Sequence, residues 1–129
     1  MMRTPTLALI LLLFVGLFSG CSALGSANSD QETLDMLRQA GSDLSKPHPF
    51  NFYLYHPDQA GAQQLCNSLS ADGFQVTVQE AASDDAWLCL ASLTMLPTIE
   101  NLAELQEKFE LLIATYRGEY DGWETRVTP

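Results

Sequence analysis

Residues 50–78 have the sequence FNFYLYHPDQAGAQQLCNSLSADGFQVTV, which contains a strand, a helix and a second strand. In the first six positions apolar and polar residues alternate, the period of a strand with one face in a core. The next segment has apolar residues at the i, i+3, i+4 and i+7 spacing of a buried helix face, namely Ala62, Leu65, Cys66 and Leu69. Gly73 ends this helix, and residues 74–78 alternate again. The stretch therefore predicts a β-α-β unit.

The C-terminal half of the chain predicts a second set of the same elements. Residues 86–93 are apolar on both faces, as in a central strand. Residues 97–118 form a long amphipathic pattern that begins at a proline and ends at a glycine. Asp121 and Gly122 are expected to form a turn before a last strand over residues 123–127.

A short helix is predicted in front of these elements. Residues 29–32 have the Ser-x-x-Glu pattern of a capping box, which predicts a helix over residues 29–40, packed outside the main core. The remaining order, β-α-β-β-α-β, is that of the α+β, ferredoxin-like sandwich. We therefore expect a four-stranded antiparallel sheet in the strand order 4-1-3-2, with both long helices on one face.

The start of the chain has the parts of an export signal. Arg3 precedes an apolar run over residues 7–18, and two small residues stand directly before Cys21. This pattern resembles the bacterial lipobox, in which the cysteine becomes the lipidated N-terminus of the mature protein. Ser22 is not the aspartate associated with retention in the inner membrane, which favours the outer membrane. We expect a lipid-anchored protein of the bacterial cell envelope.

This interpretation divides the chain into three parts. Residues 1–20 would be the lipoprotein signal peptide. Residues 21–49 would contain the lipidated cysteine, a flexible tether, the short helix and a proline-rich linker. Residues 50–129 would form the folded domain, which is large enough for one modest core.

The charge of the chain limits the classes of partner. The full sequence has 16 acidic and 6 basic residues, a formal net charge of −10, and loss of Arg3 with the signal would make the mature protein more negative. Such a field repels phosphate backbones and favours basic or polar protein segments. We expect a protein partner and no direct contact with nucleic acid.

A five-residue motif near the C-terminus carries a resemblance to a known family. It consists of Glu119, Tyr120, Asp121, Gly122 and Trp123. Together with the preceding amphipathic helix and the order of elements over residues 31–125, it resembles the regulator of ribonuclease E activity B family (RraB). The resemblance implies a non-catalytic module on a ferredoxin-like scaffold that acts by binding a protein, with ribonuclease E as the partner of known members.

Two surfaces are candidates for binding. The five-residue motif places carboxylates beside aromatic rings, which could form a recognition corner for a basic partner segment. The other interpretation of this motif is structural, with a turn at Asp121 and Trp123 filling the core. The alternative surface is the open sheet face with Tyr53, Tyr55 and Trp87, which would suit a small-ligand binder or an enzyme of the cell envelope.

The remaining reactive residues do not form a catalytic or metal-binding pattern. His48 and His56 have no acid or cysteine at a metal-like spacing and are expected in loops. Cys66 and Cys89 lie on a helix and a central strand, and the distance between such layers favours buried free thiols over a disulfide. No nucleophile elbow or phosphate-binding loop is visible, so we expect no enzyme activity, no cofactor and no metal.

Overall fold

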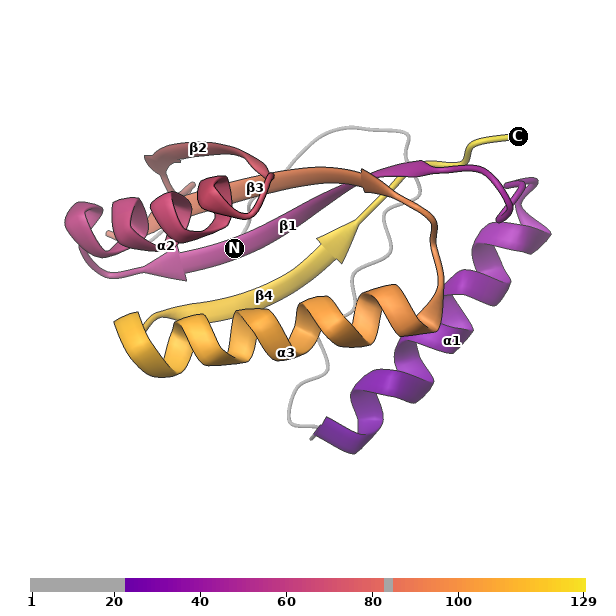
Figure 1. The fold of residues 1–129 in the computed structure, drawn as a ribbon, viewed down its shortest axis with the longest axis horizontal. Helices are drawn as coiled ribbons and strands as arrows, with labels where there is room; N and C mark the ends of the chain where they lie inside the picture. Colours follow the sequence, from indigo (N-terminus) through magenta and orange to yellow (C-terminus); the bar gives the residue numbers. More distant parts are fainter. Residues whose placement is uncertain (1–22, 83–84) are drawn as a thin grey trace.

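The computed structural model describes residues 23–82 and 85–129, so the predicted signal peptide, residues 1–20, and the predicted lipidation site Cys21 lie outside the described residues. Its elements are α1 (Ala23–Gln39), β1 (His48–His56), α2 (Gln59–Ala71), β2 (Gln75–Glu80), β3 (Trp87–Met95), α3 (Ile99–Tyr116) and β4 (Glu119–Glu124). Figure 1 shows their arrangement. Within the described part of the chain, none of the helices combines the length and the apolarity needed to cross a bilayer.

The strands form one antiparallel sheet, in the order β2-β3-β1-β4. This order is the one predicted, and the helices α2 and α3 follow β1 and β3 as in a ferredoxin-like sandwich (Figure 1). The alternation in β1 is complete, because every second residue from His48 to His56 is buried and the residues between are half-buried. The predicted α+β fold is therefore confirmed.

The core lies between the helices and one face of the sheet. Its centre is a group of aromatic rings in contact with one another, from Phe50, Phe52, Phe74, Phe109 and Trp123. Leucines of α2 and α3 surround these rings. Ring pairs of this kind add stabilisation beyond that of buried area alone. The opposite face of the sheet has no helix over it among the described residues.

Helix α1 differs from its prediction in where it begins and in what it contacts. It begins at Ala23 and not at Ser29, so the expected flexible tether is helical from residue 23 onward. Leu34 and Leu37 are 3% and 0% exposed and belong to the same core as the sheet. Burial of this face favours a helix, and a helix once started extends readily toward the N-terminus. The predicted packing of this helix outside the core was wrong.

Strand β4 also differs, because Asp121 and Gly122 lie inside it and do not form a turn. Leu54 pairs with Tyr120, but its neighbour Tyr53 pairs with Gly122, which leaves Asp121 as an extra residue in a β-bulge. Gly122 has a φ of 123°, a conformation that suits glycine.

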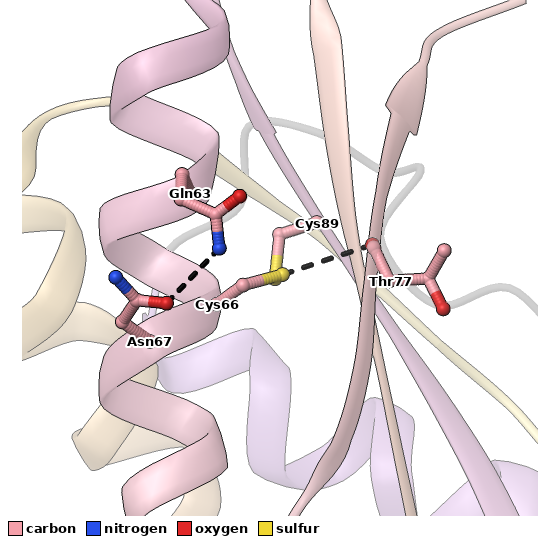
Figure 2. Close-up of a disulfide and its surroundings, with 5 residues drawn as sticks. All are labelled: Gln63, Cys66, Asn67, Thr77 and Cys89. Atoms are coloured by element: carbon pink, nitrogen blue, oxygen red, sulfur yellow. Dashed lines mark hydrogen bonds between the residues drawn. A yellow bond between two sulfur atoms is a disulfide. The ribbon is translucent and has the colours of Figure 1, made fainter.

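Cys66 and Cys89 form a disulfide between α2 and β3, which corrects the expectation of free thiols (Figure 2). Their Cα atoms are 5.6 Å apart. The layer spacing of about 10 Å is measured from the helix axis to the sheet, and a helix Cα that faces the sheet lies about 2.3 Å closer than the axis. The layer spacing therefore overestimates the distance between the two Cα atoms. Buried Ala62 on the helix and Ala91 on the sheet are small, which permits this close approach.

Candidate functional site

The structure divides the five-residue motif between the core and the surface. Trp123 is 3% exposed, and its ring lies 5.2 Å from that of Phe50. The half-buried Tyr120 packs against Phe109, with ring centroids 4.7 Å apart. Only Glu119 and Asp121 have exposed side chains. The aromatic residues of the motif therefore fill the core, as the structural interpretation predicts for Trp123.

Trp123 also connects β4 to α1 through a buried carboxylate. The indole Nε1–H donates a hydrogen bond to Oδ1 of Asp30, at 3.2 Å. Burial raises the pKa of Asp30 from 3.8 to about 6, although the hydrogen bond from Trp123 opposes this shift. Burial also raises the pKa of Tyr120 well above its usual value, and the nearby Asp30 and Asp121 add to the effect. The inner side of the motif therefore contacts a buried carboxylate, that of Asp30.

Replacing Asp30 with asparagine is expected to stabilise the protein at pH 7 by about 2 kcal/mol. Asparagine can still accept the hydrogen bond from Trp123 but carries no buried charge. In the wild type the folded state binds more protons than the unfolded state between pH 3.8 and about 6, so stability falls as pH rises through this window. Urea unfolding curves from pH 3.5 to 7.5 should show that the Asp30→Asn variant lacks this fall.

The matched control is Asp35→Asn on the same helix. Asp35 pairs with Arg38 at 3.2 Å near the surface, with side chains 47% and 60% exposed, so its replacement should change stability by less than about 0.5 kcal/mol. The difference between variant and wild type is the informative quantity, because other carboxylates titrate in both. If Asp30→Asn were less stable than the wild type at pH 7, burial of the charged Asp30 carboxylate would not be destabilising.

The alternative site was predicted on the sheet face opposite α2 and α3, but only part of it is assembled there. Tyr53 and Tyr55 are half-buried on this face, at alternate positions of β1. Trp87 pairs with His56, which is a buried residue of the helix-covered face. Trp87 therefore lies on the opposite side of the sheet from the two tyrosines, and the structure does not bring the three together.

A polar network that the sequence did not predict lies on this same face. Ser92 donates a hydrogen bond to the side-chain oxygen of Asn51 at 2.7 Å, and the Asn51 amide donates to Oε2 of Glu124 at 3.0 Å. The hydroxyl of Tyr53 donates to the same oxygen at 2.7 Å. The alternation in β1 could have placed Asn51 beside Tyr53. Glu124 was missed because its position opposite Asn51 depends on the register between β4 and β1.

Both histidines are structural and lie in β1, not in loops. His56 is held by the carbonyl of Tyr116 at Nε2 and by the N–H of Asp58 at Nδ1, at 2.8 and 3.0 Å. A Cβ at Gly61 would overlap its ring, so this glycine gives the imidazole its space. The ring lies at an open, shallow cleft between the start of α2 and the end of α3. Across the described residues, no group of three His, Cys, Asp or Glu side chains could hold a metal ion.

Comparison with known proteins identifies the family. No curated protein matches the chain. A family model described as regulator of ribonuclease activity B (RraB) matches residues 27–125, a segment that includes most of α1 and every strand of the sheet. This match covers most of the chain and the whole of the motif over residues 119–123. The protein therefore belongs to the regulator of ribonuclease activity B family.

Proposed function

We propose that the protein is a non-catalytic regulator that binds another protein and acts from the cell envelope, to which lipid at Cys21 anchors it. The observation that carries this proposal is the family match, which extends from α1 through β4 and so includes the entire core. Members of this family are regulators of ribonuclease activity. A shared fold does not determine the cellular compartment, so location in the cell envelope must rest on other features of the chain.

The disulfide between Cys66 and Cys89 supports a location in the cell envelope. Disulfides form and persist in oxidising compartments and are rare where thiols are kept reduced. Cys66 and Cys89 are both 0% exposed, so once formed their bond is shielded from reductants in solution. The signal-like pattern from Arg3 to Cys21 points to the same compartment. These two features are independent, since one lies in the leader and the other in the core.

The start of α1 bears on how such an anchor would hold the domain. Helix α1 begins at Ala23, two residues after Cys21. A lipid at Cys21 would therefore hold the domain close to the membrane surface, in the outer membrane if Ser22 directs sorting. Because α1 is packed into the core through Leu34 and Leu37, the domain would move with its anchor and not on a loose tether.

The proposed partner is a protein with a basic or polar segment. The net charge of −10 favours cationic partners and opposes contact with nucleic acid. Within the five-residue motif, the exposed carboxylates of Glu119 and Asp121 would meet the partner, whereas Tyr120 and Trp123 would support the strand from inside. Ribonuclease E, the partner that the family resemblance implies, is one candidate.

The anchor is tested by comparing the full-length wild type with a Cys21→Ser variant in bacteria. The wild type should incorporate labelled fatty acid and sediment with outer membranes. The variant should take up no label and appear in the soluble envelope fraction, because it lacks the thiol that receives the lipid. Equal sedimentation of both chains, without acyl label on the wild type, would rule out the lipoprotein assignment.

Partner binding is assessed in the same experiment. Cross-linking before lysis should attach wild type and variant to envelope proteins, and probing the products for ribonuclease E tests the family partner directly. A chain without residues 1–20 serves as the control, because it remains with the cytoplasmic ribonuclease. If only this control is linked to ribonuclease E, the binding surface is that of the family and export has changed the partner.

A further inference from the structure

The sheet face opposite α2 and α3 combines aromatic rings with negative charge. Its centre holds Tyr53 and Tyr55 of β1, and β4 contributes Glu119 opposite Tyr55 and Glu124 opposite Asn51. None of the four strands contains a lysine or an arginine. The face therefore has two carboxylates without a strand cation to neutralise them, next to the half-buried rings of two tyrosines, a type of side chain that attracts flat cationic groups.

The carboxylate of Glu124 is held in place by residues of two other strands. Tyr53 and Asn51 of β1 both donate to its Oε2, and Ser92 of β3 orients Asn51. Among the residues that the structure describes, none is hydrogen-bonded to the second oxygen, Oε1. A half-buried carboxylate fixed through one oxygen, with the other available, is preorganised to accept a donor from a ligand.

We propose that this face binds an extended basic segment of a partner protein, with an arginine paired to Glu124 beside the ring of Tyr53. This inference rests on the proposed function and specifies where and by what chemistry the partner binds. Arginine fits better than lysine, because a planar guanidinium can stack on a ring while its N–H groups donate to Oε1. Single-stranded RNA also stacks on sheet tyrosines, but it needs a cationic surround that these strands lack.

The position of Glu119 sets a spacing for the basic residues. The partners of Glu119 and Glu124 on β1 are Tyr55 and Asn51, which are four residues apart. Four residues of an extended strand span about 13 Å. A partner segment in extended conformation along β1 would therefore present two basic side chains four residues apart, one to each glutamate.

The test is fluorescence anisotropy of a synthetic extended peptide with two arginines four residues apart, titrated with purified full-length protein at low salt. The wild type should bind it, and Glu124→Gln should weaken binding about tenfold, the usual scale for a partly desolvated charge pair. Tyr53→Phe, which removes only the hydroxyl that positions Glu124, should weaken binding about threefold. The matched control is Glu104→Gln on the exposed face of α3, which makes the same change of charge without affecting binding.

The outcomes separate this inference from the proposed function. Each variant should keep the thermal midpoint of the wild type, because the sheet face is outside the core. Equal losses for Glu124→Gln and Glu104→Gln would show general charge attraction and overturn the site. Absence of peptide binding, or binding of a labelled single-stranded RNA in its place, would also overturn it. In either case the cross-linking experiment still decides whether the protein is a protein-binding regulator.

Discussion

Replacing Trp123 with alanine is expected to lower the free energy of unfolding by about 4 kcal/mol, the usual cost of removing a large buried aromatic side chain. Trp123 is 3% exposed and stands in β4 opposite Phe52, with Phe50 in contact. The substitution would open a cavity at the junction of β4 and α1. It would also leave the buried carboxylate of Asp30 without its donor. Urea unfolding at pH 7, followed by circular dichroism, measures this loss.

Trp123→Phe separates the two parts of this effect, because it keeps most of the ring and removes the indole N–H. Its loss should be about 2 kcal/mol, that of a hydrogen bond to a charged group. If Trp123→Ala were instead as stable as the wild type and bound its partner more weakly, the ring would be a contact residue and not a core residue. Because Trp123 is buried, we expect any loss of partner binding by Trp123→Ala to result from damage to the core.

Reducing the Cys66–Cys89 disulfide is expected to cost about 3 kcal/mol, because the bond restricts the unfolded chain over a sequence separation of 23 residues. The fold should survive at moderate temperature. In the reduced protein the Cys66 thiol could donate to the carbonyl oxygen of Thr77, which lies 3.7 Å from its sulfur (Figure 2). Thermal unfolding with and without reductant measures the difference.

A double variant, Cys66→Ala with Cys89→Ala, is the control for effects of the reductant itself. Its thermal midpoint should be the same in both buffers and below that of the oxidised wild type. Labelling of Cys66 and Cys89 by a thiol reagent in unfolded, non-reduced wild type would contradict the disulfide, and reductant would then have no effect on stability.

The parts of the fold that were predictable are those in which apolar periodicity is regular. The alternation in β1 and the helical stripes of α2 and α3 gave the order of elements, and that order gave the strand order. The start of α1 was not predictable in this way, because Ser29 and Glu32 fit a capping box and also occur inside a helix. The disulfide depends on how closely α2 approaches β3, a distance that spacing along the chain does not contain.

For the candidate site, the sequence predicted the sheet face of some single residues but not which residues of other strands lie next to them. Alternation along β1 correctly placed Tyr53 and Tyr55 on one face, but it said nothing of which residues lie across from them. Trp87 was misplaced because the phase of β3 relative to β1 is set by their pairing. The importance of Asp30 was also missed, since its partner Trp123 is 93 residues away in the sequence.

The bulge at Asp121 has a consequence for insertions and deletions in this strand. In a regular strand, residues at odd separations point in opposite directions, so Tyr120 and Trp123 would face apart, as would Glu119 and Glu124. The single extra residue of the bulge reverses this parity, which sends both rings inward and both carboxylates outward. Losing one residue here would exchange core and surface on one side of the bulge. The length of the motif is therefore a requirement of the fold, whichever partner the outer face binds.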